Sequence, residues 1–466
     1  MSPRAPKTRL LLTLAPGAST HEPSLGRLPK AVSRALKRLA SGGVTEETLE
    51  RIALEGGVEA AARLHVVLAR LSQRGLLHFV VRGKTGELAR LTPTRPLLAF
   101  APCAPSPKRL LRLSRFALLR RDGDGLVLES PRAHARVALA GPALPLVAAL
   151  AAPLTSREAA ARLPSPERPA ARSLVDILFR AGLLVETEED GSTIEERDPG
   201  LALWEFHDLL FHTRTRRPSP GQPHGATYRL ADTVAPLPVV APVTGPLVAL
   251  RRPDLERLRR EDPPLAEVME RRRSIRESGD DPLTLDQLSE LLYRCARLRE
   301  VLPGERDPVS RRPHPSGGAR YPLELYLTVS ACHGLEPGLY RYEPASHQLE
   351  RRSGMTRAVE ELLDAHRPGA NTPQVLLTLA ARFPRVSWKY QSIAYALVLK
   401  EAGVLLQSLS LAATALGLAA CVLGHGDVEA FERAAGTDGH VESSVAELAL
   451  GSLPTRGPLG NPGAHT

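Results

Sequence analysis

The chain has 466 residues, of which 43% are hydrophobic and 24% charged, and this composition excludes a disordered or fibrous protein and indicates two or three globular domains. The formal net charge is +10, but only seven of the 61 basic residues are lysines. Such a bias reflects a GC-rich coding sequence and is weak support for nucleic-acid binding. The widely separated cysteines, Cys103, Cys295, Cys332 and Cys421, argue against a disulfide scaffold and a zinc site. A reducing cytoplasm is the expected compartment.

Two N-terminal segments follow one plan, in which short helices lead to a glycine, a leucine pair and an extended arm. Helices are predicted at 31–40, 46–54 and 60–74 in the first segment and at 144–150, 156–163 and 169–181 in the second. The last helix of each segment ends at a glycine, Gly75 or Gly182. This pattern is typical of a winged helix-turn-helix. We therefore predict winged-helix-like domains at residues 1–100 and 101–190.

The helices that would enter DNA in such domains lie at 60–65 and 169–172, and both are rich in alanine. A DNA reader presents arginine, lysine, asparagine or glutamine on this helix. The composition favours protein or peptide binding, and no nucleic-acid partner is expected.

A connector is predicted at residues 191–254. It begins with acidic and polar residues and continues with aromatic and apolar residues at helical spacing over 204–212. It then becomes rich in proline and arginine between Arg214 and Pro253. We expect a packing helix followed by an extended tether laid over a surface.

An enzyme domain of the α+β class is predicted at residues 255–466, where helices and strands alternate. Strands are predicted at 323–330, 338–343, 375–381 and 418–423, and helices at 264–273, 285–296, 357–364 and 393–416. Residues 402–424 carry no charge and are long enough to span a bilayer. Because polar residues such as Gln407 and Ser410 interrupt them, we expect a helix buried on all sides and no membrane.

A cluster of basic residues follows the predicted helix 264–273. It contains Arg272, Arg273, Ser274 and Arg276. Planar guanidinium donors match phosphate oxygens, so the cluster is suited to a phosphate dianion. Arg272 and Arg276 would converge if the stretch stays helical. The alternative is a solvated basic helix end that the helix dipole favours.

This cluster resembles the phosphate-binding signature of the nitroreductase-like flavoproteins. Further motifs resemble one branch of them, the SagB-type azoline dehydrogenases, which include the cyanobactin oxidases. They are LLFHTRTR at 209–216, RRRSIRESGDDPLTLDQLSELLYRCAR at 271–297, PSGGARYPLE at 315–324, PGLYRY at 337–342, WKY at 388–390, EAG at 401–403, Gly424 and ALGSLP at 449–454. The resemblance covers about 200–466 and extends to the paired winged helices. It implies a mixed sheet flanked by helices and a homodimer with FMN in two sites between the subunits.

The resemblance also implies which residues bind FMN. Arg272, Arg273, Ser274 and Arg276 would hold the phosphate, and Ser316, Gly317 and Gly318 would reach the flavin from the partner subunit. Gly424 would line the isoalloxazine and Arg456 the phosphate. A loop without bulky side chains lets its backbone approach a flavin closely, although an ordinary glycine turn before a strand has the same composition. No metal is expected.

The pair Lys389 and Tyr390 is catalytic in the family and is the predicted catalytic pair here. The implied reaction oxidises peptide thiazolines or oxazolines to thiazoles or oxazoles, which removes a hydride and a proton. A lysine ammonium beside the phenol favours the tyrosine anion. Consecutive residues of a helix diverge by about 100°, so the pair can act together only on a loop or at a helix start. The alternative is a packed tyrosine beside an exposed lysine.

The predicted function is an FMN-dependent azoline dehydrogenase of ribosomal peptide biosynthesis. Its expected partners are an azoline-containing precursor peptide and a YcaO-type cyclodehydratase. The alternative is a generic NAD(P)H-dependent nitroreductase or quinone reductase, and a DNA-binding regulator is a third interpretation. The N-terminal domains would bind a leader segment or scaffold the dimer. Residues 297–315, rich in arginine and proline, receive no assignment.

Overall fold

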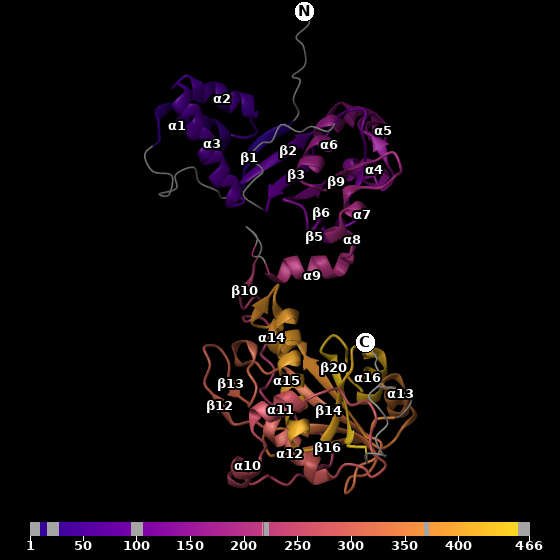
Figure 1. The fold of residues 1–466 in the computed structure, drawn as a ribbon. Coiled ribbons are helices and arrows are strands. Elements are labelled where there is room, and N and C mark those ends of the chain that lie inside the picture. Colours follow the sequence, from indigo (N-terminus) through magenta and orange to yellow (C-terminus); the bar gives the residue numbers. More distant parts are fainter. Residues whose placement is uncertain are drawn as a thin grey trace, which may run out of the picture. The chain divides into compact units, whose positions relative to one another are not determined.

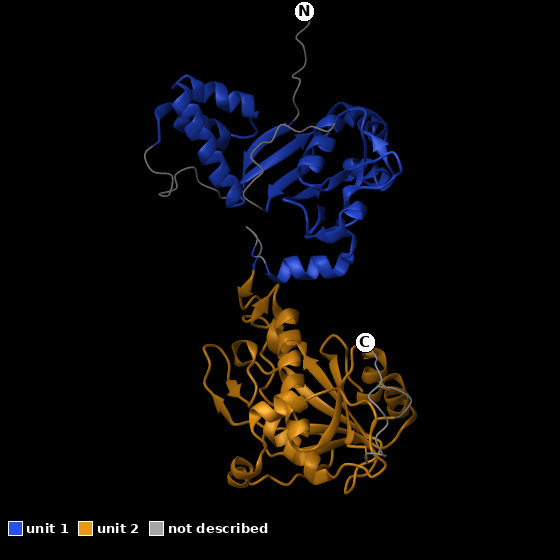
Figure 2. Cartoon of the chain, viewed as in Figure 1, with its two compact units in different colours: residues 1–223 blue, residues 224–466 orange. Residues whose placement is uncertain are grey.

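The computed structural model describes residues 10–15, 28–94, 106–216, 218, 223–367 and 372–454. The chain divides into two compact units, residues 1–223 and residues 224–466 (Figure 2). The end of the predicted connector, from His224 onward, therefore belongs to the second unit. The predicted boundary near residue 100 and the predicted phosphate ligand Arg456 lie outside the described residues.

Unit 1 contains a six-stranded antiparallel sheet of order β1-β2-β3-β7-β6-β5 (Figure 1). Its strands are β1 (Leu10–Leu14), β2 (Leu77–Arg82), β3 (Glu87–Pro93), β5 (Leu118–Asp122), β6 (Gly125–Glu129) and β7 (Ala135–Leu139). Strand β3 of the first predicted domain pairs with β7 of the second, with Ala89 opposite Leu139. The two N-terminal segments thus share one sheet, and their assignment to the winged-helix class stays a prediction.

The helices of unit 1 follow the predicted pattern. They are α1 (Lys30–Ala40), α2 (Glu46–Leu54), α3 (Val58–Gln73), α4 (Leu144–Ala149), α5 (Ser156–Ala161), α6 (Ala171–Arg180), α7 (Ile194–Arg197), α8 (Pro199–Ala202) and α9 (Phe206–Arg216), with short 3₁₀ turns at Gly141–Ala143 and Ser165–Ala170. A small sheet of order β8-β4-β9 joins Leu154–Thr155, Leu110–Leu113 and Leu184–Thr187. Capping boxes, such as Thr155 with Glu158, start two of these helices.

A buried carboxylate ties the two N-terminal segments together. Glu167 accepts hydrogen bonds from the backbone N–H groups of Lys84 (2.8 Å) and Thr85 (2.9 Å) in the β2–β3 turn. Gly83 lies against it, because a Cβ there would come within 1.6 Å of the carboxylate. A side chain at position 83 would therefore displace the Glu167 carboxylate from this turn.

Unit 2 is built on a seven-stranded sheet of order β11-β16-β15-β14-β17-β20-β19. Its strands are β11 (Leu247–Ala249), β14 (Leu323–Val329), β15 (Gly338–Glu343), β16 (Gln348–Ser353), β17 (Val375–Arg382), β19 (Leu418–Val422) and β20 (Glu442–Ser452). Two-stranded pairs are formed by β10 (Gly225–Ala226) with β18 (Tyr390–Gln391) and by β12 (Glu300–Leu302) with β13 (Val309–Arg311). The helices are α10 (Leu255–Glu261), α11 (Leu265–Arg271), α12 (Leu285–Ala296), α13 (Arg357–Ala365), α14 (Phe383–Ser387), α15 (Ala394–Ala415) and α16 (Val428–Ala435), with a 3₁₀ turn at Gly317–Ala319.

The expectation of a mixed sheet is wrong, because every strand pair of this sheet is antiparallel within the described residues. The chain does cross from β17 through α15 to a strand of the same direction, β19. The unpredicted strand β20 lies between these two and pairs with both, with Leu377 and Val422 opposite Leu448. The α+β class itself is confirmed.

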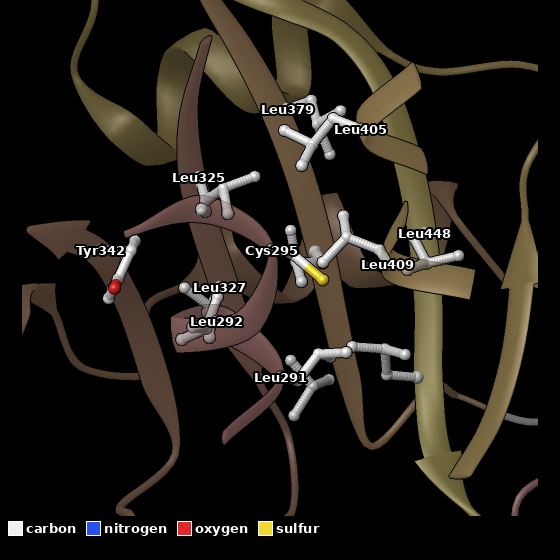
Figure 3. Packing of buried hydrophobic residues seen from close by; sticks show 14 of the residues in the cluster. Leu291, Leu292, Cys295, Leu325, Leu327, Tyr342, Leu379, Leu405, Leu409 and Leu448 are labelled. Carbon is white, nitrogen blue, oxygen red and sulfur yellow. The ribbon is translucent and has the colours of Figure 1, made fainter. Parts of the chain in front are cut away.

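Alternation along the strands divides the core of unit 2 into two layers. Leu325 and Leu327 of β14 face α12 and α15, whereas Tyr326 faces α13 and α16. Figure 3 shows the first layer, with side chains of α12 and α15 pointing at the sheet. Its labelled members are Leu291, Leu292, Cys295, Leu325, Leu327, Tyr342, Leu379, Leu405, Leu409 and Leu448.

Helix α15 is long and apolar enough to cross a membrane by length and composition, and half of its most apolar window is buried inside the protein. The expectation that it is buried on all sides is wrong. Tyr395, Leu399 and Val404 are 48%, 36% and 38% exposed. Because these apolar side chains are exposed, α15 also presents an apolar surface.

Candidate active site

The arginine cluster lies on an extended segment and not on a helix. Helix α11 ends at Arg271, and Arg272 has extended backbone angles (φ −58°, ψ 121°). The N–H of Ile275 then donates to the carbonyl of Ala420 in β19 (3.0 Å). The predicted convergence of Arg272 and Arg276 across a helical turn is therefore wrong. In an extended chain alternate residues share a side, which groups Arg272, Ser274 and Arg276.

The guanidinium groups of this segment have no counter-ion among the residues that the structure describes. Arg272, Arg273 and Arg276 are exposed, and no hydrogen bond or ion pair joins their guanidinium groups to any other described residue. The neighbouring Arg271 is different, since it donates to Glu267 one turn earlier in α11 (3.0 Å). Three unpaired guanidiniums and a hydroxyl within five residues can bind an external anion.

A cavity of about 430 Å³ lies between α15, β20 and the loop that follows β19. It is lined by Tyr395, Leu399, Ala402, Gly403, Leu406, Leu423, Gly424, His425, Gly426, Val428, Ser444, Val445, Ala446 and Glu447. A Cβ on Gly424 would meet no atom within 4 Å, so this loop leaves room beside its backbone. Burial raises the pKa of Glu447 to about 7, so the cavity wall contains a neutral acid below that pH.

The arginine segment leads toward this cavity. The backbone N–H of Ile275 donates to the carbonyl of Ala420 in β19, and that of Gly279 donates to the carbonyl of Ser452 in β20. Ser452 in turn lies opposite Leu418, the first residue of β19. The segment therefore runs antiparallel to β19, and its first residue, Arg272, lies near the end where the Leu423–Gly426 loop begins. The predicted phosphate ligands and Gly424 thus belong to one region.

The loop Ser316–Gly318 packs against α15. The hydroxyl of Ser316 donates to the buried carboxylate of Glu401 and accepts from the N–H of Tyr321 (2.9 Å). A Cβ on Gly317 would lie 3.2 Å from Leu397. The Ser316 side chain is therefore engaged inside the protein, so only the backbone of this loop is available to a ligand.

The predicted catalytic pair lies on a turn. Lys389 follows α14, Tyr390 begins β18, and α15 starts only at Ala394. The two residues are therefore not consecutive positions of a helix, where their side chains would diverge by about 100°. The amine of Lys389 lies 5.4 Å from the centroid of the Tyr390 ring. The Tyr390 hydroxyl lies directly over Gly318, where a Cβ would come within 2.2 Å of it. The structure brings Lys389, Tyr390 and Gly318 together in one chain.

Backbone strain gathers around this turn. Five non-glycine residues of the described chain have positive φ, and four of them are Tyr228 (50°), Ala319 (56°), Tyr321 (43°) and Ser392 (67°). They belong to the glycine loop, the stretch after Tyr390 and the segment that pairs with it. Strained residues of this kind persist where the surroundings enforce them, and they cluster at active sites.

A buried ion cluster that the sequence analysis missed fixes these segments. Asp307 pairs with Arg320 (2.6 Å) and Arg385 (3.4 Å), and all three side chains are at most 5% exposed. Arg320 donates to the carbonyl of Arg385 (2.8 Å), and Arg385 donates to those of Arg320 and Leu237. Asp307 comes from the unassigned residues 297–315, which therefore anchor the end of the glycine loop to α14, just before the predicted catalytic turn.

Helix α15 separates the predicted site residues into two sets. The loop 316–318 packs on Leu397 and Glu401, whereas the cavity beside Gly424 is lined by Tyr395, Leu399 and Ala402. At 100° per residue, these groups lie on opposite sides of the helix. One chain alone does not bring the glycine loop to the cavity.

Two families match this chain. Residues 269–452 match the Nitroreductase family, and residues 111–219 match the family described as Cyanobactin oxidase ThcOx. The first match contains the arginine segment, the glycine loop, the lysine–tyrosine turn and the cavity. The second runs through unit 1 from β4 to just beyond α9.

Similar proteins include one named as a nitroreductase and one named as a Microcin B17-processing protein. MJ1384 of Methanocaldococcus jannaschii, named as a nitroreductase, is 31% identical over 187 residues, which are 39% of this chain and 85% of that protein. The Microcin B17-processing protein McbC of Escherichia coli is 34% identical over 121 residues, which are 24% of this chain and 44% of McbC. A chain of the solved E. coli microcin synthetase McbBCD complex with truncated pro-MccB17 bound is 20% identical, with 53% of this chain and 92% of that chain covered and a TM-score of 0.35.

Proposed function

This chain belongs to the nitroreductase family, and from that premise we propose that it is an FMN-dependent dehydrogenase that oxidises peptide thiazolines or oxazolines to thiazoles or oxazoles. The observation that carries the proposal is the presence of a cyanobactin-oxidase match in the same chain as the nitroreductase match. The likeness to McbC, a peptide-processing protein, supports the same substrate class. The likeness to MJ1384 favours the alternative, a generic nitroreductase.

FMN is the cofactor of the family, and the residues present fit it. Arg272, Ser274 and Arg276 offer side-chain donors for the phosphate that no other described residue occupies. The loop at Gly424 leaves open space for a flat ring beside its backbone. When bound, FMN supplies the two-electron acceptor of the oxidation. Arg456 remains a further proposed phosphate ligand.

The division of the site across α15 supports a homodimer as the proposed assembly. The cavity beside Gly424 and the glycine loop lie on opposite sides of this helix. A second copy of the chain would bring its Ser316–Gly318 backbone to the first copy's cavity. The exposed apolar side of α15, with Tyr395 and Leu399, is suited to such a contact.

Lys389 and Tyr390 handle the proton in the proposed reaction. Formation of the aromatic ring removes two hydrogen atoms from the azoline, one as a hydride and one as a proton. The Tyr390 oxygen, held over Gly318 with the Lys389 amine above its ring, accepts the proton.

The proposed partners follow from this substrate. An azoline-containing precursor peptide supplies the rings, and a YcaO-type cyclodehydratase forms them. Unit 1 would bind the leader part of the peptide, with an edge strand of the β8-β4-β9 sheet as the place of strand addition. The cytoplasm is the proposed location.

A direct assay tests this function. The FMN-loaded protein is incubated with a thiazoline peptide, and mass spectrometry follows the loss of about 2 Da per ring that removal of two hydrogens produces. We expect oxidation of the ring and slow flavin bleaching by NADPH. Rapid bleaching with turnover of a nitroaromatic compound and no peptide oxidation would establish the generic nitroreductase instead.

The arginine segment gives a prediction about cofactor affinity. Replacing Arg272 or Arg276 by alanine is expected to weaken FMN binding about tenfold to a hundredfold, because a hydrogen bond to a charged group contributes ~1.5–3 kcal/mol. Quenching of FMN fluorescence by the flavin-free protein measures this affinity. Arg271→Ala is the matched control, since that guanidinium already binds Glu267. An equal loss in the control would contradict the assignment.

A further inference from the structure

Tyr228 lies against the lysine–tyrosine turn, although the sequence predicts only an extended tether at this position. The N–H groups of Thr227 and Tyr228 both donate to the carbonyl of Lys389 (3.1 and 3.2 Å). Just before them, Ala226 of β10 pairs with Tyr390 of β18. The backbone after residue 223 is therefore joined to both members of the proposed catalytic pair.

The ring of Tyr228 also contacts the Lys389 side chain. The Lys389 amine lies 5.7 Å from the centroid of the Tyr228 ring and 5.4 Å from that of Tyr390. Both distances are within the range of a cation–π contact. The Lys389 ammonium therefore contacts two aromatic rings, those of Tyr228 and Tyr390.

The Tyr228 ring is itself held in place. Its hydroxyl lies 3.2 Å from the Glu305 carboxylate, the edge-to-face contact with Trp388 has a centroid distance of 5.5 Å, and the Arg306 guanidinium lies 4.8 Å from its centroid. Its φ of 50° is unfavourable for a tyrosine. Such a backbone persists only where the surrounding contacts enforce it, which indicates a constrained and not an incidental position.

We propose that Tyr228 is a positioning residue for Lys389, whose ammonium it fixes beside the Tyr390 ring. The inference rests on the proposed function, because it assigns Tyr228 a part in the same site. It extends the proposed catalytic centre to Tyr228. Removal of the ring frees the lysine side chain, whereas removal of the hydroxyl alone leaves the cation–π contact intact.

Lysine reactivity tests this proposal without the azoline reaction. The FMN-loaded protein is treated with a limiting amount of an amine-acetylating reagent, and peptide mass spectrometry gives the labelling of Lys389 relative to the exposed Lys37 of α1. In Tyr228→Leu this ratio is expected to rise about twofold to fivefold, the effect of losing one cation–π contact at a partly exposed site. In Tyr228→Phe it should stay at the wild-type value.

Kinetics supply the second readout. Tyr228→Leu is expected to lower kcat for azoline oxidation with KM little changed, and Tyr228→Phe should restore kcat. Leu230→Ala, on the same segment and 41% exposed in the wild type, controls for disturbance of the loop and should resemble wild type in both assays. Equal labelling in the Leu variant and wild type, or equal effects of Leu and Phe, would overturn the proposal. If the labelling changes as expected but the wild-type protein oxidises no azoline, the proposed function fails and the contact with Lys389 stands.

Discussion

Replacing Lys389 by methionine or Tyr390 by phenylalanine is expected to slow azole formation by about two to four orders of magnitude, the usual contribution of a positioned acid or base. Met keeps the length of the lysine side chain without its charge, and Phe keeps the ring over Gly318 without the proton-accepting oxygen. The arginine segment and the cavity beside Gly424 are unchanged by either substitution. FMN should therefore stay bound.

Initial rates of peptide oxidation, followed by mass spectrometry, measure the effect, and the ratio of flavin to protein absorbance reports FMN content. Lys37→Met in α1 and Tyr293→Phe in α12 make the same chemical changes away from the site and should retain wild-type rates. If both site variants remain as active as these controls, Lys389 and Tyr390 are not the acid–base pair. Loss of FMN from either variant would instead assign it to cofactor binding.

The sequence predicted best those elements whose pattern is strong locally. Helix α12 and strand β15 have the predicted bounds. Thr284 and Gln287 form a capping box at the start of the amphipathic helix α12, and β15 begins at a glycine and contains two tyrosines. The direction of the sheet was not predictable in this way. It depends on the insertion of β20 between β17 and β19, and hydrophobic periodicity says nothing about strand order.

Some residues of the candidate site could likewise be predicted from the sequence, whereas others could not. The position of Lys389 and Tyr390 on a turn followed from helical geometry, and Gly318 followed from its motif. Tyr228 and Asp307 were missed because each acts through residues far away in the sequence. Asp307 meets Arg385 78 positions later, and Tyr228 meets a lysine that no local pattern connects to it. The arginine and proline residues around Asp307 are typical of an exposed loop, and this composition gave no sign that the Asp307 carboxylate is buried.

Replacing Asp307 by alanine is expected to lower the free energy of unfolding of unit 2 by about 3–5 kcal/mol, the cost of breaking a buried ion pair from one side. The substitution leaves two buried guanidiniums, Arg320 and Arg385, without their shared counter-ion. Burial and the charge of Arg320 already lower the pKa of Arg385 to about 10. Without Asp307 these two cations repel each other between the glycine loop and the predicted catalytic turn.

Tryptophan fluorescence can isolate this effect, because the chain has two tryptophans, one in each unit. In a Trp204→Phe background the urea transition reports Trp388, whose ring lies 5.6 Å from the Arg320 guanidinium. Glu300→Ala is the matched control: it removes an exposed carboxylate that pairs with Arg311 at 2.6 Å, and a surface pair contributes about 0–1 kcal/mol. A destabilisation by Asp307→Ala no larger than that of the control would mean that the cluster does not hold the turn. A large destabilisation would instead mean that residues 297–315, whose composition resembles an exposed loop, hold the turn of Lys389 and Tyr390 in place.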